Sequence, residues 1–210
     1  FPLEEVIKKH FFTNNSNFKV SGKLSPTFNM KATIATGYVI PAIEKYRAFI
    51  DNDLNPLILS AGNPNLKLPK KHSFNFEMNQ MFVKNASSFQ FKASLEMQED
   101  YVANNSRYFT EETYLAEYDY TFLRGSVLNT VENADNYYRL FADLLYMKLS
   151  NLLKSNVIIK AEYCYNEIPA FSQGLKNNLI MNEGYISVNL TTNFSRKVEF
   201  VFGSGTRLSR

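Results

Sequence analysis

The stretch from Ala134 to Leu153 constrains the fold of this chain most strongly, because its apolar residues recur with the period of a helix. Its sequence is ADNYYRLFADLLYMKLSNLL. One set of apolar residues follows three- and four-residue steps, namely Ala134, Tyr138, Phe141, Leu145, Leu149 and Leu152. A second set widens this stripe, namely Tyr137, Leu140, Leu144 and Met147. So wide a stripe indicates a helix that packs on more than one side. We therefore expect a central helix over residues 134–153 with β-sheet laid against it.

Strict alternation of apolar and polar residues flanks this stretch on both sides and predicts strands with one dry face. The cleanest run has Phe89, Phe91, Ala93, Leu95 and Met97 on one face, and Gln90, Lys92, Ser94 and Glu96 on the other. Similar patterns predict strands at about 18–20, 28–34, 74–82, 114–123, 157–165, 185–191 and 197–202. The 18 Phe and 13 Tyr residues agree with a sheet-rich fold, since both types favour strands.

Two shorter helices and three irregular connections complete the expected order of elements. Pro2 near a first turn, with acidic residues before basic ones, predicts a helix at 2–12. Pro41 predicts the start of a second helix, at 41–52. Residues 51–73, 99–113 and 168–183 show no regular pattern. We therefore expect a single α+β domain over 1–210, mainly antiparallel sheet packed on one long helix. Two βαββ-like halves, at about 18–98 and 114–202, are a suggestion within it.

Composition narrows the class of protein. The net charge of +3 comes from interleaved basic and acidic residues, which argues against a dedicated nucleic-acid binder. The single cysteine, Cys164, excludes an intrachain disulfide and a cysteine-based zinc site. No run reaches the roughly 18–20 apolar residues of a membrane-spanning helix, so we expect no transmembrane segment. The chain begins with Phe1-Pro2, which favours removal of a signal peptide, with removal of a propeptide or tag, or trimming of the sequence, as alternatives.

The candidate nucleophiles and bases favour structural roles over catalysis. His10 falls on the apolar face of the first expected helix, and His72 follows Lys71 in a basic connection. Cys164 lies in the middle of a strand pattern, where no neighbour in sequence would lower the pKa of its thiol. Glu117 and Asp119 share one face of an expected strand, so they are the best candidate for paired catalytic carboxylates. A solvated strand face explains that pair more simply.

The remaining motifs indicate no cofactor, metal or nucleic-acid site. No cluster of His, Asp and Glu has ligand spacing. Gly203-Ser-Gly205 lacks the strand-to-helix context of a phosphate-binding loop. Three basic residues lie near aromatic residues on polar strand faces, as in proteins that bind single-stranded nucleic acid, namely Lys92, Lys160 and Arg196. The regular rows of aromatic residues, however, fall on the expected core face. We therefore predict no catalytic, cofactor-binding or metal-binding residues.

Three functions remain for such a chain. The first is a non-catalytic structural or assembly protein, a subunit of a virion, tail or cell-envelope complex that acts through protein–protein contacts. Apolar residues on nominally polar faces would serve as contacts, namely Leu115, Leu123 and Ile158. The second is a binding protein for a hydrophobic small molecule or lipid between sheet and helix. A hydrolase with a dispersed site has the least support. We expect protein partners, a homo-oligomer or larger assembly, and a secreted, periplasmic or virion location rather than the cytoplasm.

Overall fold

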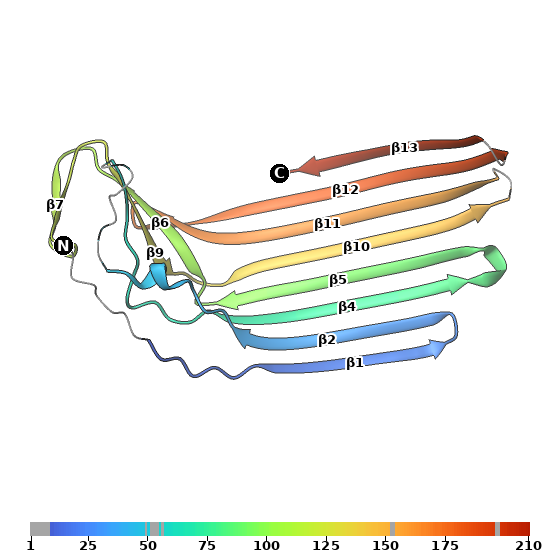
Figure 1. Ribbon diagram of the computed structural model, residues 1–210, viewed down its shortest axis with the longest axis horizontal. Coiled ribbons are helices and arrows are strands. Elements are labelled where there is room, and N and C mark those ends of the chain that lie inside the picture. Colours follow the sequence, from blue (N-terminus) through green and yellow to red (C-terminus); the bar gives the residue numbers. More distant parts are fainter. Residues whose placement is uncertain (1–8, 49, 51–54, 56, 152–153, 196–197) are drawn as a thin grey trace.

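The computed structural model describes residues 9–48, 50, 55, 57–151, 154–195 and 198–210, which form an almost entirely β structure (Figure 1). The first strands are β1 (Ser16–Ser25), β2 (Phe28–Tyr38), β3 (Ile58–Ser60), β4 (Lys70–Phe82) and β5 (Ser87–Glu99). Next come β6 (Val102–Tyr108), β7 (Thr113–Leu115), β8 (Tyr120–Phe122) and β9 (Val127–Asn133). The last are β10 (Tyr137–Ser150), β11 (Ser155–Ser172), β12 (Leu175–Ser195) and β13 (Val198–Ser209). The short 3₁₀ helices η1 (Ile43–Tyr46) and η2 (Val83–Asn85) are the helical segments of the described residues.

Eight long strands form one curled antiparallel layer, here called the main sheet (Figure 1). Their order is β1-β2-β4-β5-β10-β11-β12-β13. The registers are continuous except for two shifts, between Lys23 and Ser25 and between Asn193 and Ser195. The alternation in β4 slips near Gln80 and Met81, which predicts a bulge, but β4 keeps its register with β5 from Lys70 to Phe82, so the bulge is absent.

The central helix predicted for residues 134–153 is wrong, because this stretch is mostly strand β10. β10 pairs with β5 from Tyr137 to Lys148 and with β11 from Tyr138 to Ser150. Its alternate residues Tyr138, Leu140, Ala142, Leu144 and Tyr146 face one side. Phe141, Leu145 and Met147 make the other side apolar too, so the strand also matches a helical period. Hydrogen bonds to two neighbouring strands outweigh the local helix preference. The fold is therefore β, and the α+β class is wrong.

The two shorter predicted helices also fail where the structure describes them. Residues 1–8 of the 2–12 prediction lie outside the described part, and residues 9–12 have no regular structure. Of the 41–52 prediction only η1 is helical, and residues 49, 51 and 52 lie outside the described part. The irregular stretches 99–113 and 168–183 contain β6 and the extended ends of β11 and β12. The division into one domain or two halves stays a prediction.

Residues of 39–69 and 100–136 gather at one end of the main sheet and are here called the end region (Figure 1). It contains β3, β6 and β9, which pair in the order β6-β9-β3, and the separate hairpin β7–β8. β6 joins the main sheet through a short parallel pairing with the end of β11, at Phe171 and Ser172. The predicted strand 114–123 is this hairpin, with a turn at residues 116–119.

The end region holds the hydrophobic core. Leu59, Phe109, Phe122 and Leu128 are buried together, with the rings of Phe109 and Phe122 stacked at 4.4 Å. A second cluster contains Tyr46, Leu66, Val102 and Val131. Among the described residues, every fully buried aliphatic or aromatic side chain belongs to the end region. The main sheet therefore has no covered core of its own within the described residues.

The two ends of the main sheet differ in their connections. At the end far from the end region, residues 26–27 and 83–86 form short turns between consecutive strands (Figure 1). At the other end, residues 39–69 link β2 to β4, residues 100–136 link β5 to β10, and a short turn at Gln173 and Gly174 joins β11 to β12. The two long connections therefore lie at the end-region end, together with one short turn.

Candidate functional site

One side of the main sheet, here called the apolar face, is a continuous field of aliphatic and aromatic side chains. Side chains paired across neighbouring strands share a face. One register row contains Val20, Ala32, Phe76, Ala93, Ala142, Tyr163, Gly184 and Leu208. The next row contains Gly22, Met30, Met78, Phe91, Leu144, Ala161, Ile186 and Thr206. These two central rows carry no charged residue. The apolar sides of all eight long strands thus join into one surface, including that of β10, whose sequence pattern predicts a helix.

The apolar face is uncovered in the described structure. Phe18 is 65% exposed, Ile34 53% and Ile186 61%, although alternation would assign all three to a core. A methyl group added to Gly22 or Gly184 would meet nothing within 4 Å. A contiguous apolar surface of this width on one chain marks a site of contact with another molecule.

Both outer strands of the main sheet, β1 and β13, pair on one side only within the described residues. Their outward backbone N–H and C=O groups can therefore accept a further strand, which makes such edges sites of strand addition. The sheet thus offers two open edges beside its apolar face.

The opposite side of the main sheet, here called the polar face, carries ordered charges. Lys31, Glu77, Lys92 and Asp143 stand opposite one another in consecutive strands, with alternating sign. Lys31 and Glu77 approach to 3.8 Å, and Lys160 pairs with Glu162 at 2.6 Å. Asn79 donates one hydrogen bond to Asn29 and accepts one from Gln90. This face is built for contact with water or a polar molecule.

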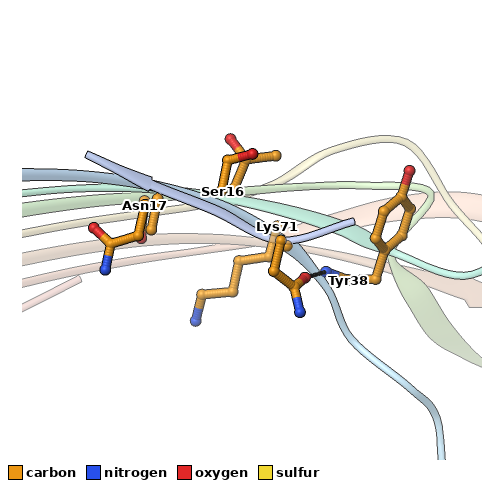
Figure 2. A pocket seen from close by; sticks show the side chains of 9 residues that line it. Ser16, Asn17, Tyr38 and Lys71 are labelled. Carbon is orange, nitrogen blue, oxygen red and sulfur yellow. Dashed lines mark hydrogen bonds between the residues drawn. The ribbon is translucent and has the colours of Figure 1, made fainter. Parts of the chain in front are cut away.

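Two hollows lie close to the end region on the polar face, share Ser73 in their linings, and are together called the polar groove here. Its first part, of about 350 Å³, includes Asn15, Asn17, Ala35, Gly37, Lys71 and Ser73. Its second part, of about 210 Å³, includes Ser73, Ser94, Glu96, Arg139 and Phe141. In Figure 2, Asn17 and Lys71 point to the groove side of the strands, whereas Ser16 and Tyr38 point to the other side. The Asn15 Oδ1 atom accepts a hydrogen bond from the Tyr38 backbone N–H at 3.3 Å.

Glu96 is the acidic centre of the polar groove. Its Oε2 atom lies 2.7 Å from Lys71 Nζ, and its Oε1 atom accepts a hydrogen bond from Gln98 at 2.9 Å. Burial raises the pKa of this carboxyl group, but the hydrogen bonds from Lys71 and Gln98 outweigh burial, so the pKa falls below its usual value. Arg139 stands directly opposite Glu96 in the register and adds to the decrease. The groove therefore presents a fixed carboxylate between two cations.

The histidines and the cysteine are not brought together. His10 is exposed and outside any helix. His72 bonds through Nδ1 to the Thr36 hydroxyl, at 3.0 Å, and its Nε2 lies 3.3 Å from Glu99. His72 belongs to the apolar face, whereas Cys164 lies opposite Phe141 on the polar face and accepts a hydrogen bond from Asn166. The sheet therefore separates the sulfur from the imidazole of His72.

Glu117 and Asp119 lie in the exposed turn between β7 and β8, not on a strand face as predicted. The Tyr114 hydroxyl donates a hydrogen bond to Asp119 at 2.7 Å. Burial, together with the charge of Glu117, raises the pKa of Tyr118 to about 12. Leu115 belongs to β7 and packs against the core of the end region, so it is a structural residue rather than a free contact.

The other singled-out residues are dispersed. Gly203 and Gly205 lie within β13, where a Cβ atom would meet the side chains of Asn189 and Tyr185. Lys92 and Lys160 lie on the polar face, and Arg196 lies outside the described residues. Leu123 is 48% exposed, and Ile158 shares the polar face with Met147. In the described ranges no three His, Cys, Asp or Glu side chains are grouped to hold a metal ion.

The apolar face also has a shallow hollow of about 370 Å³, here called the apolar hollow. Small residues Ala142, Ala161 and Gly184 line it together with Phe91, Ile186 and Leu208. It is the nearest counterpart of the cavity that we expected for a hydrophobic ligand, although no helix forms its other wall. Within the described residues, no helix has the length and hydropathy needed to cross a membrane.

Comparison with models of known protein families finds no match, and comparison with curated proteins finds none either. The surfaces themselves therefore carry the functional argument. Sequence patterns identified the apolar residues of β2, β4, β5 and part of β11 but assigned them to a covered core, and they assigned those of β10 to a helix. The polar groove was missed, although one signal was present, namely small residues at polar-face positions 35, 37, 73 and 94.

Proposed function

We propose that this chain is a non-catalytic structural part of a cell envelope, whose main sheet places its apolar face against lipid acyl chains. The uncovered apolar face, eight strands wide, is the observation that carries the proposal. Leaving such a surface in water is unfavourable by about 25 cal/mol per Å². A hydrocarbon environment removes this cost without requiring a matching protein surface.

The dimensions of the apolar face support a bilayer as its partner. From Tyr138 to Tyr146 the face extends about 27 Å along β10, at about 3.4 Å per residue. The hydrocarbon core of a bilayer is about 30 Å thick, and apolar bands of membrane-embedded sheets are about 25 Å tall. The Tyr138 row at one end of this band already contains His72 and Glu167, and Lys148 follows Tyr146 at the other end.

The polar face and the connections agree with this assignment. Lys92 and Asp143 lie beside the central rows of the apolar face, at a depth where charges cannot face lipid. The sheet would therefore separate lipid on one side from water on the other. The two long connections lie at the same end of the sheet, which is also usual for strands that cross an envelope membrane, although the short β11–β12 turn lies at that end too.

The open edges imply protein partners. In hydrocarbon an unpaired backbone group costs several kcal/mol, so β1 and β13 require further strands beside them. This requirement agrees with the expected assembly through protein–protein contacts. We expected no transmembrane segment because the sequence has no apolar run as long as a membrane-spanning helix. Strands of alternating apolar and polar residues do not produce such runs. We propose that the strands, rather than a helix, contact the bilayer.

A second candidate function is the binding of a hydrophobic small molecule in the apolar hollow. This function is favoured by the depth of the hollow, which exists because Ala142, Ala161 and Gly184 are smaller than the side chains around them. In that case one ligand would occupy the hollow, and the rest of the apolar face would contact protein.

Depth-dependent fluorescence quenching tests the bilayer proposal. The chain has no Trp, so a single introduced Trp reports on its own position. Ala93→Trp and Ser94→Trp place the indole on opposite faces of β5, at neighbouring positions. After reconstitution in phosphatidylcholine vesicles with brominated acyl chains, we expect strong quenching for Ala93→Trp and little for Ser94→Trp. Equal quenching of the two variants, or none in either, would refute contact between the apolar face and lipid.

A further inference from the structure

The polar groove runs across the strands rather than along them. Asn17, Ala35, Ser73, Glu96 and Arg139 follow one another in register, from β1 at one edge to β10 near the centre. The groove exists because Ala35, Gly37, Ser73 and Ser94 are shorter than their neighbours. A Cβ atom at Gly37 would lie 2.7 Å from the Asn15 side-chain oxygen, so the Asn15 amide would have to move to accept a larger residue. Short side chains thus form a floor between polar walls.

The walls offer donors and acceptors in nearly equal measure. Lys71 and Arg139 donate, Glu96 accepts, and the amides of Asn15 and Asn17 do both. Glu96 is held by Lys71 and Gln98, so a ligand would meet a carboxylate that is already oriented. Phe141 adds an apolar ring beside Arg139 on the same strand. This mixture suits a ligand that has many hydroxyl groups and apolar C–H surfaces.

We infer that the polar groove binds a carbohydrate chain, through Glu96 and Arg139 at its β5–β10 end and the ring of Phe141 at its wall. Sugar hydroxyls donate and accept at once, as this lining requires. A simple anion is disfavoured because the Glu96 carboxylate lies between Lys71 and Arg139. A peptide is disfavoured because an extended peptide satisfies its backbone at a strand edge, whereas the groove lies on a face. The inference is independent of the bilayer contact, since the polar face is open in either case.

Titration calorimetry of the full chain in detergent micelles tests this inference, with cellotetraose, maltotetraose and chitotetraose as probes. We expect at least one tetrasaccharide to bind with a Kd of millimolar or below. Ser73→Leu fills the floor of the groove, and Arg139→Ala removes a central donor. Each should weaken binding at least tenfold.

The matched control is Ser88→Leu, a residue on the same polar face but outside the groove, opposite Met147. It should leave the Kd unchanged, and circular dichroism should show the same sheet content in all variants. Three results would overturn the inference. They are no binding of any tetrasaccharide to the natural sequence, equal binding by Ser73→Leu and Ser88→Leu, or binding of inorganic phosphate or an extended octapeptide at this site instead.

Discussion

The end region and the main sheet use their apolar residues in opposite ways. In the end region, Phe122 and Leu59 are 0% exposed and packed among other side chains of the same chain. In the main sheet, the equally apolar Phe18 and Phe200 are 65% and 57% exposed. The difference teaches that apolar alternation shows which side chains share a face, but does not show what covers that face. The end region supplies its own cover, whereas the main sheet requires another molecule.

Removing a ring from each region should give the largest contrast. Phe122 stacks on Phe109 at 4.4 Å and contacts the edge of Tyr120, so Phe122→Ala leaves a cavity. We expect a loss of about 3–5 kcal/mol in the free energy of unfolding. Phe18→Ala removes a ring that is mostly exposed and should cost below about 1 kcal/mol in water. Urea denaturation in the absence of lipid measures both values. Similar losses would contradict the contrast between the regions.

A charge on each face of β10 sharpens the comparison between the faces of the main sheet. Leu144 lies on the apolar face and its neighbour Leu145 on the polar face. In vesicles, we expect Leu144→Arg to destabilise the inserted protein by about 2–4 kcal/mol, as for arginine at the middle of a bilayer. Leu145→Arg should change it by about 0.5 kcal/mol or below. Guanidinium titration of the reconstituted protein measures both, and equal effects would count against lipid contact.

Glycine substitutions compare the packing of the two regions at the backbone. A Cβ atom at Gly62 would lie 2.5 Å from the backbone of Lys45, so the end region must shift to accept Gly62→Ala. We expect a loss of about 1–3 kcal/mol in stability. Gly22→Ala in β1 meets no neighbour, and should be neutral or stabilising by up to about 1 kcal/mol. Thermal unfolding of the two variants decides, and a stable Gly62→Ala variant would show that the close approach is relaxed in solution.

Acid should affect the main sheet through Glu96, with the smallest effect of the series. The pKa of Glu96 is lowered in the folded chain, so its ion pair with Lys71 stabilises the fold above the unfolded pKa. That contribution is lost as the pH falls through the folded pKa. Because the Lys71 side chain is 40% exposed, we expect the ion pair to contribute below about 1 kcal/mol to the free energy of unfolding. Glu96→Gln should reduce the loss of stability between pH 7 and pH 3, and an unchanged loss would show that the pair contributes nothing.

Much of the main sheet could be predicted from sequence, because its strands alternate cleanly. The pattern placed Phe89 to Met97 on a strand and correctly separated the residues of the apolar face from those of the polar face. It failed for Ala134 to Leu153, where apolar residues on both faces of β10 satisfy the strand and helix periods together. It failed again for β12, whose first half has no regular alternation but pairs with β11 over its full length. In both cases the structure depends on pairing with neighbouring strands of the sheet, and a local pattern of residues gives no information about such pairing.

The candidate surfaces were harder to predict than the strands. The apolar face follows from alternation, yet its exposure depends on whether any other segment packs on it. The polar groove depends on Ala35 lying opposite Ser73 and on Ser94 lying diagonally across from Ser73 on β5, and these neighbours are known only once the register is known. A search of aligned strands for small residues that are neighbours on one face would have found it.

The long connection between β5 and β10 also has a consequence for the order of folding. Pairs such as β1–β2, β4–β5 and β10–β11 form across short turns, whereas β5 meets β10 only after residues 100–136 are folded back. Closing a long loop costs entropy before the pairing returns any stability, so this step is intrinsically slow. When the end region condenses, it holds the two strands at a short distance. We therefore expect folding of the end region to bring separately formed hairpins together into one sheet.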